Sequence, residues 1–167
     1  MKLKGIIDCD FTNYKKPVIT LEFPYCDFKC DKLNGCQVCQ NSALAREPDV
    51  DISAEKIWEL YISNPLTKGF CFQGLEPFSN PMDLAELLYF IRKIKKCNDD
   101  IVIYTGFNKG EDLVCENIIR KYNNIIVKWG RYIMNQESHY DEILGVKLAS
   151  NNQYAEEINY ESTCNTQ

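Results

Sequence analysis

Residues 18–41 read VITLEFPYCDFKCDKLNGCQVCQN, a short strand pattern that leads directly into a loop with four cysteines. The β-branched and aromatic residues of VITLEF are typical of a strand. The cysteines lie between Cys26 and Cys39, within the segment 24–41 that we call the cysteine loop. Such a loop can hold disulfides, a zinc ion or an iron–sulfur cluster, and the rest of the chain has to discriminate among these three kinds of site.

The composition of the chain is that of an ordinary globular protein. Its 167 residues, 45% hydrophobic and 26% charged, fit a single domain with a sizeable core. The net charge of -5 argues against a general nucleic-acid binder, because no basic stripe is available to neutralise phosphates. We find no apolar run of transmembrane length and no signal peptide, and therefore expect a cytoplasmic protein without a membrane partner.

The nine cysteines are better explained by metal binding than by disulfides. In a reducing cytoplasm a tight cysteine cluster binds metal more often than it forms disulfides. The five cysteines outside the loop are scattered singly: Cys9, Cys71, Cys97, Cys115 and Cys164. Cys71 and Cys115 fall in apolar strand and helix patterns, so we expect them to be small core side chains.

Strands and helices alternate along the chain. Strands are predicted at residues 18–23, 70–74, 101–104 and 125–129, and helices from Ser53, from Asn80-Pro81 and over residues 110–122. Ser53 and Asn80 suit helix N-caps, and in the third helix Leu113, Val114 and Ile118 are expected to face inward. The alternation predicts βαβ units and an α/β fold with a mainly parallel sheet. We expect one domain over residues 1–155 and a flexible tail over 156–167.

A polar or glycine-rich segment follows each predicted strand. These segments are the cysteine loop, QGLEP at 73–77, YTG at 104–106 and GR at 130–131. Because the carboxyl ends of parallel strands meet at one edge of a sheet, we expect the four segments to converge there.

The cysteine spacing alone leaves the kind of metal site open. Cys26-x3-Cys30 and Cys36-x2-Cys39 are separated by only five residues, which would be unusually compact for a zinc site. Four thiolates would saturate a 4Fe–4S cluster that only carries electrons, whereas three would leave one iron open to a substrate or cofactor.

The segments around the cysteines resemble a known family. CDFKC and CQN after a strand, with GLEP at 74–77 one βα unit later, resemble the radical S-adenosylmethionine (SAM) enzymes, which carry a C-x3-C-x2-C motif and a GGEP element. The short length, IVIYTG at 101–106, GRYI at 130–133 and SNNQ at 150–153 are more narrowly similar to the anaerobic ribonucleotide-reductase activating enzymes. The resemblance runs from about residue 5 to residue 154.

The resemblance implies a fold, cofactors and a reaction. It implies a partial, open βα barrel that binds a 4Fe–4S cluster and SAM. One electron, from a flavodoxin- or ferredoxin-type donor, would cleave SAM to a 5′-deoxyadenosyl radical. The radical would take hydrogen from a glycine of a partner glycyl-radical enzyme, an anaerobic ribonucleoside-triphosphate reductase. This reaction needs no general base, so no catalytic side chain is assigned. The lone His139 is expected to be a surface or partner-facing residue rather than a catalyst.

Site residues follow from the resemblance position by position. The implied cluster ligands are Cys26, Cys30 and Cys39, and the implied SAM-binding residues are Val38, Gln40, Gly74, Glu76, Thr105 and Gly106. Lys128 and Arg131 are expected either to bind a carboxylate, of SAM or of the partner, or to lie at the solvated edge of the last strand.

Two departures from the family pattern leave alternatives open. The insertion before Cys39 also allows a triad of Cys26, Cys36 and Cys39, and Leu75 replaces the second glycine of GGEP. Glu76 has an alternative interpretation as a surface charge. The alternative functions are a small radical SAM enzyme with another substrate and a four-cysteine zinc or iron–sulfur module without catalysis.

Overall fold

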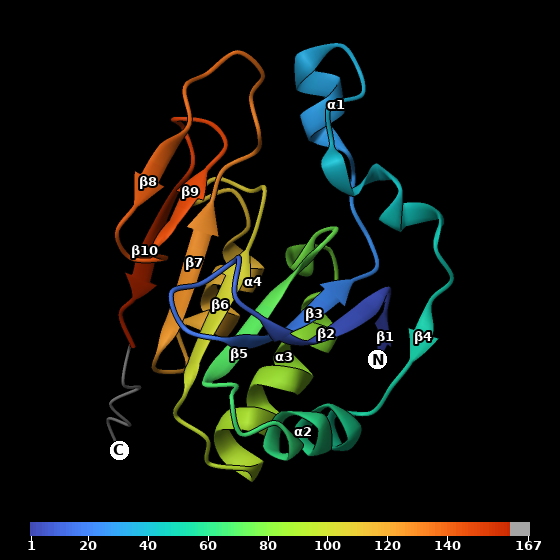
Figure 1. Cartoon of the computed structure of the whole chain (residues 1–167), viewed down its shortest axis with the longest axis vertical. Coiled ribbons are helices and arrows are strands. Elements are labelled where there is room, and N and C mark those ends of the chain that lie inside the picture. Colours follow the sequence, from blue (N-terminus) through green and yellow to red (C-terminus); the bar gives the residue numbers. More distant parts are fainter. Residues whose placement is uncertain (161–167) are drawn as a thin grey trace.

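The computed structural model describes residues 1–160, and a six-stranded sheet forms its centre (Figure 1). The strand order is β10-β7-β6-β5-β3-β2. Four neighbours are parallel: β3 (Val18–Phe23), β5 (Gly69–Gly74), β6 (Asp100–Tyr104) and β7 (Ile125–Trp129). The edge strands β2 (Gly5–Asp10) and β10 (Tyr154–Ile158) pair antiparallel with β3 and β7. The fold is therefore mixed α/β with a mainly parallel sheet, as the alternating pattern predicted.

The helices lie between the parallel strands in the sequence. They are α1 (Lys29–Asn34), α2 (Ala54–Ser63), α3 (Pro81–Tyr89), which continues as the π-helical turn η4 (Phe90–Ile94), and α4 (Leu113–Ile119). The expected caps are confirmed, because Ser53 accepts a hydrogen bond from the Lys56 amide and Asn80 accepts one from the Asp83 amide. Short 3-10 turns are η1 (Gln40–Ser42), η2 (Leu44–Arg46) and η3 (Pro77–Ser79).

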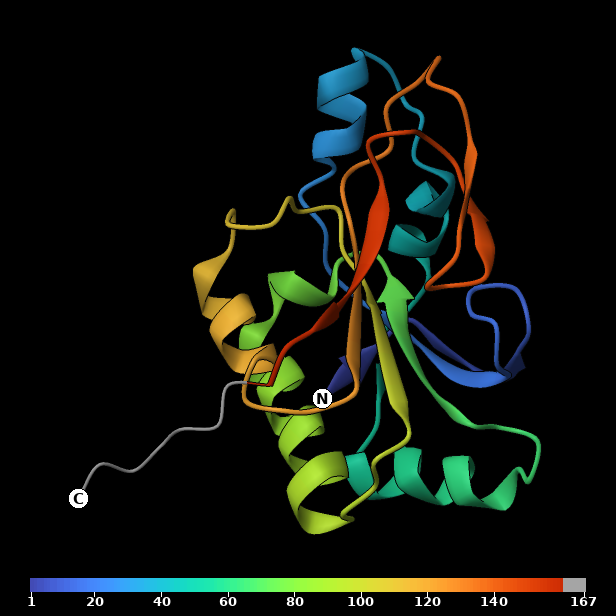
Figure 2. The same cartoon turned by 90° about the vertical axis from the view of Figure 1, so that its left-hand side faces the viewer.

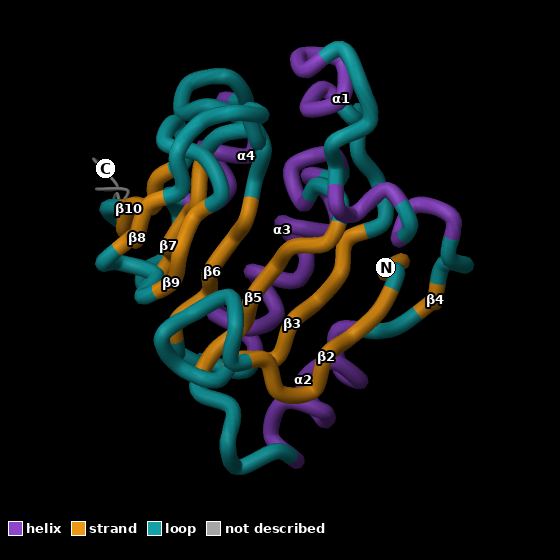
Figure 3. The backbone as a smooth tube through the Cα atoms, turned by 45° about the horizontal axis from the view of Figure 1, so that its top comes forward, coloured by secondary structure: helices purple, strands orange, loops and turns teal. Residues whose placement is uncertain are grey.

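Two small antiparallel pairs complete the structure. They are β1 (Lys2–Leu3) with β4 (Val50–Asp51), and the hairpin of β8 (His139–Asp141) with β9 (Val146–Leu148). Figure 3 shows α1 and the loops around the β8–β9 hairpin on the two sides of the same end of the sheet. This is the end at which the parallel strands finish.

Successive strand residues point to opposite faces of the central sheet, and both faces are covered. One face, with Leu21, Phe72 and Ile103, packs against α2, α3 and α4. The other face, with Cys71 and Val102, is covered by Tyr14 from the loop after β2 and by the hairpin region. Figure 2 shows α3 and α4 on one side of the sheet and the hairpin on the other. Cys71 and Cys115 are fully buried, which confirms their expected place in the core.

The orientation predicted for α4 is wrong for two of its three residues, whereas Ile118 is partly buried against the core as expected. Leu113 and Val114 were expected to face inward, but their side chains are 64% and 62% exposed. The helix begins at Leu113 rather than near residue 110, because Asp112 caps it by accepting from the Cys115 amide at 3.0 Å. The buried positions are Cys115, Glu116 and, one turn after Cys115, Ile119.

The end of the sheet lies beyond the boundary predicted from the sequence. β10 extends to Ile158, paired with Ile125 of β7, whereas the domain was expected to end at residue 155. Residues 161–167, which include Cys164 and most of the expected tail, lie outside the described residues. Within residues 1–160, no helix is both long enough and apolar enough to cross a lipid bilayer.

Candidate functional site

A cavity of about 730 Å³ lies at the carboxyl end of the parallel strands. Its wall contains residues at the carboxyl ends of all four strands. They are Cys26, Cys30 and Cys39 after β3, Gly74 at the end of β5 with Leu75 and Glu76 after it, Thr105 and Gly106 after β6, and Gly130 and Arg131 after β7. The predicted convergence of these segments is therefore confirmed. Val38 and Gln40 lie on the same wall, so the structure brings together all the residues assigned to the site from the sequence.

Three of the four loop cysteines face this cavity. Cys26, Cys30 and Cys39 are partly buried on its wall. Cys36 is exposed and is not part of the wall, and its sulfur lies 3.6 Å from the carbonyl oxygen of Asn34. The geometry thus favours the triad that contains Cys30 over the one that contains Cys36. The eight cysteines among the described residues are all free thiols.

The insertion between Cys30 and Cys39 forms a helix that brings the third cysteine back to the cavity. α1 ends at Asn34, and its C-cap residue Gly35 has a φ of 67°, which allows the chain to reverse. One carboxylate oxygen of Asp31 accepts hydrogen bonds from the amides of Val38 and Cys39, both at 2.9 Å. Asp31 therefore holds the returning segment beside the start of α1.

Asn34 fastens the same insertion to the chain after β7. Its amide nitrogen donates to the carbonyl oxygens of Cys30 at 2.7 Å and Tyr132 at 3.1 Å, and its oxygen accepts from the Met134 amide at 2.7 Å. The helix is thus held at both ends by side chains of the insertion.

Burial raises the pKa of two of the wall thiols, Cys26 and Cys30. It raises the pKa of Cys26 to about 11, although a hydrogen bond from the Phe28 amide to its sulfur opposes the shift. Burial also raises the pKa of Cys30, and the neighbouring Cys39 adds to this effect. Metal binding at these thiols must therefore release protons.

The kind of ligand on the wall suits an iron–sulfur cluster. Three thiols from one loop lie there, and cysteine thiolates are the usual ligands of 4Fe–4S clusters. Within residues 1–160, no group of three or more His, Cys, Asp or Glu side chains forms a site that could hold a metal ion. The type of ligand, rather than a preformed ligand geometry, therefore supports the cluster.

Glu76 connects the ends of two neighbouring strands. One carboxylate oxygen accepts from the Thr105 hydroxyl at 2.8 Å and the Phe78 amide at 3.0 Å, and the other accepts from the Gly106 amide at 2.8 Å. Glu76 is only 4% exposed, so the alternative interpretation as a surface charge is wrong. Burial raises the pKa of Glu76 to about 7 in spite of these hydrogen bonds.

The backbone at Gly74 requires glycine, whereas the next position does not. Gly74 has a φ of 90°, and a Cβ atom there would lie 2.8 Å from the Cα of Glu22. Leu75 is not among the residues with positive φ, so leucine in place of the second glycine of the family pattern causes no backbone strain. The side-chain nitrogen of Asn41 donates to the Gly74 carbonyl at 2.6 Å and joins the cysteine loop to this strand end.

Two buried cations also line the wall. Lys128 and Arg131 are each 7% exposed, so the alternative of a solvated strand edge is wrong for both. Lys128 donates to the Gly130 carbonyl at 2.7 Å, and burial lowers its pKa to about 8. Arg131 donates through Nη1 to Glu111 at 2.8 Å, but its Nη2 is buried without a hydrogen-bond partner. A buried donor of this kind on a cavity wall favours an anionic ligand.

Family comparison agrees with this geometry. The chain matches the model of a family described as a 4Fe-4S single cluster domain over residues 18–154. This protein belongs to that family. The match begins with the first residue of β3 and ends with the first residue of β10, so it contains the cysteine loop and all four strand ends. A comparison with curated proteins gave no match.

Membership in the 4Fe-4S single cluster domain family supports a 4Fe–4S cluster as the cofactor of this protein. It also agrees with the cysteine-based prediction of a metal site. The supporting residues Asp31, Asn34 and Glu111 were not predicted. Their types are common in loops, and the contacts that make them informative join segments far apart in the sequence. His139, expected at the surface, is half-buried in β8.

Proposed function

We propose that this protein is a radical SAM enzyme that forms a glycyl radical on a partner enzyme. The observation that carries the proposal is the position of the cysteines, with three thiols on the cavity wall and Cys36 outside it. Three protein ligands leave one iron of a 4Fe–4S cluster free to bind a second cofactor, whereas four would close the site. We also propose that the sheet and its helices are the open βα barrel of that superfamily.

The proposed SAM site is the remainder of the cavity wall. Gly74 and Glu76 would line the methionine end, with Glu76 holding the Gly106 amide in place. The carboxylate of SAM is the anionic group that we assign to Lys128 and to the unpartnered Nη2 of Arg131. A buried guanidinium donor gives a carboxylate a short, charge-assisted hydrogen bond.

The other end of SAM would lie along the cysteine loop and the end of β6. Val38 and Gln40, which flank Cys39, are assigned to the adenine, and Thr105 and Gly106 to the ribose or adenine. When bound, the reduced cluster supplies the electron that cleaves SAM into methionine and a 5′-deoxyadenosyl radical. The protein residues position SAM and exclude water from it.

The proposed substrate is a backbone glycine of an anaerobic ribonucleoside-triphosphate reductase. The similarity of the IVIYTG, GRYI and SNNQ segments to the activating enzymes supports this choice. Parts of the wall reach the surface, because Asp27, Gln40 and Lys147 are exposed, so a segment of another protein has access. A flavodoxin- or ferredoxin-type protein is the proposed electron donor.

The test is anaerobic reconstitution with iron and sulfide, followed by reduction and EPR spectroscopy with and without SAM. We expect a 4Fe–4S signal that changes when SAM is added, together with formation of 5′-deoxyadenosine. A signal indifferent to SAM would contradict the radical SAM assignment and favour a binding or electron-transfer module.

A second experiment tests the substrate. The reduced protein, SAM and a candidate anaerobic reductase are mixed, and a glycyl radical is sought on the reductase by EPR. Cleavage of SAM without a glycyl radical on the reductases tested would favour a radical SAM enzyme with another substrate.

A further inference from the structure

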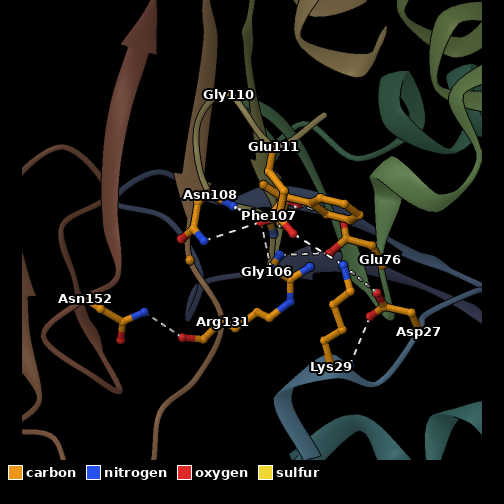
Figure 4. A network of polar contacts seen from close by, with 12 residues as sticks. Asp27, Lys29, Glu76, Gly106, Phe107, Asn108, Gly110, Glu111, Arg131 and Asn152 are labelled. Carbon is orange, nitrogen blue, oxygen red and sulfur yellow. Dashed lines mark hydrogen bonds and ion pairs between the residues drawn. The ribbon is translucent and has the colours of Figure 1, made fainter. Parts of the chain in front are cut away.

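A chain of ion pairs joins the cysteine loop to Arg131 on the cavity wall (Figure 4). Lys29, between the first two cysteines, lies 3.4 Å from Oε1 of Glu111. The second oxygen of Glu111 accepts from Nη1 of Arg131 at 2.8 Å. One oxygen of Glu111 therefore contacts the cysteine loop, and the other contacts Arg131. The second guanidinium nitrogen of Arg131, Nη2, has no hydrogen-bond partner on the cavity wall.

Phe107 packs inside this chain of charges. Its ring centre lies 4.9 Å from the guanidinium carbon of Arg131 and 5.7 Å from the ammonium nitrogen of Lys29. Both distances are within the range of cation–π attraction. The Asn108 amide donates to Glu111 at 2.9 Å, so the loop after β6 fixes the carboxylate as well as the ring.

Most exposed ion pairs contribute little, but this chain differs from them in burial and in the number of contacts. The side chain of Arg131 is only 7% exposed, and that of Glu111 is 29% exposed. The hydrogen bond from Arg131 lowers the pKa of Glu111 to about 2, so its carboxylate is charged at neutral pH. Glu111 therefore holds Arg131 by one nitrogen and leaves the other available.

We propose that Glu111 is a positioning residue that ties the cysteine loop to Arg131, so that the cluster-binding thiols and the anion-binding nitrogen keep a constant separation. The tie itself is independent of the identity of the ligand. Its benefit for SAM, whose carboxylate is assigned to Arg131, rests on the proposed function.

The loop after β6, which carries Glu111, also carries an ion pair that serves as a matched control. Lys109 lies 2.8 Å from Glu156 of β10, with side chains 46% and 26% exposed. Lys29 and Glu111 are similarly exposed, at 46% and 29%. The two pairs thus resemble each other in exposure, but only the pair with Glu111 reaches the cysteine loop.

The experiment is hydrogen exchange of the full chain under reducing conditions, followed in peptides from residues 24–41. In Glu111→Gln we expect exchange about tenfold faster in these peptides, because charge-assisted contacts are lost, and no change in the β5 and β6 peptides. Glu156→Gln should leave the cysteine loop unchanged. Unaltered exchange in Glu111→Gln, or an equal acceleration in Glu156→Gln, would overturn the proposal.

A second variant keeps the test decisive if Glu111→Gln is generally destabilised. Lys29→Ala preserves the Arg131–Glu111 contact and must by itself accelerate exchange of the cysteine loop. In the Lys29→Ala background, Glu111→Gln should add less than it does alone, since both changes remove the same tie. Full additivity would overturn the proposal.

SAM affinity distinguishes this inference from the proposed function. If the reconstituted wild type binds SAM, Glu111→Gln should bind it about tenfold more weakly and Glu156→Gln should bind it equally well. If the wild type does not bind SAM, the proposed function fails, and the hydrogen-exchange result alone decides whether the tie exists.

Discussion

Arg92 and Arg131 are equally buried, each 7% exposed, and lie at opposite ends of the same sheet. Arg92 belongs to the turn after α3 and reaches the chain that precedes β6 and β7. It donates to four carbonyl oxygens, those of Asn123, Cys97, Asp99 and Asn124, at 2.8–3.2 Å. Arg131 follows β7, donates to Glu111 alone among the described contacts, and has a buried Nη2 without a partner.

This difference separates a structural cation from one available to a ligand. Burying a charged group is costly unless its donors are satisfied, and Arg92 meets that condition with protein carbonyls alone. The donors of Arg131 are satisfied only in part, and its unsatisfied side chain lies on the wall of a cavity. The amino end of the sheet is thus built for stability, whereas the carboxyl end retains unsatisfied groups, which is typical of binding sites.

The largest expected effect tests whether the carboxyl end is the metal site. Cys30→Ala should abolish stable 4Fe–4S binding, because it removes a thiol from the cavity wall. Cys36→Ala should retain the cluster, because Cys36 is exposed outside that wall. Iron and sulfide content after anaerobic reconstitution measures both. Loss of the cluster in both variants would indicate a four-thiolate site and remove the proposed open iron.

The next effect compares the two arginines directly. Arg92→Met should lower the free energy of unfolding by about 3 kcal/mol, because several carbonyl oxygens lose their donor. Arg131→Met should lower it by only about 1 kcal/mol, since one hydrogen bond to Glu111 is lost rather than four to carbonyl oxygens, but should weaken SAM binding about tenfold or more. Urea denaturation of the reduced chain measures stability, and equal losses for the two variants would contradict the distinction.

An effect of similar size concerns the rigidity of the backbone at the carboxyl end. Gly74 and Gly110 have φ values of 90° and 85°, but a Cβ atom at Gly74 would meet the Glu22 backbone, whereas one at Gly110 would meet nothing within 4 Å. Gly110→Ala should therefore cost about 1 kcal/mol from strain alone. Gly74→Ala should cost about 2 kcal/mol more, because the clash adds to the strain. Thermal unfolding of both variants provides the measurement, and equal costs would mean that the backbones at Gly74 and Glu22 separate freely.

The smallest effect is a pH dependence at the carboxyl end. The folded-state pKa of Glu111 is about 2, below its ordinary value of 4.5, because of the hydrogen bond from Arg131. The stabilisation from this contact is therefore present above pH 4.5 and is lost as the pH falls toward 2. The stability difference between wild type and Glu111→Gln should be below about 1 kcal/mol near neutrality and should shrink over that interval. Denaturation at stepwise lower pH checks it, and a constant difference would argue against the Arg131 contact.

Local patterns predicted the parallel core of the fold well. β3 and β7 have the predicted bounds, and the caps at Ser53 and Asn80 are present, because strand patterns and caps depend on near neighbours. The edge strands β2 and β10 and the hairpin were not predicted. The two hairpin strands have only three residues each, and β2 contains a register shift between Ile7 and Asp10. The pairing of these strands therefore depends on partners elsewhere in the chain. The inward orientation of Leu113 and Val114 was mispredicted because α4 begins later in the chain than the sequence indicated.

The sequence by itself determined that four thiols follow one strand and that the polar segments after four parallel strands meet at one edge. Chain direction in a parallel sheet is sufficient for that inference. Only the tertiary structure decided that Cys36 lies outside the cavity and that Arg131, not Arg92, keeps a free nitrogen. These outcomes depend on contacts between distant segments, such as Asn34 with Met134, and local sequence patterns carry no information about them.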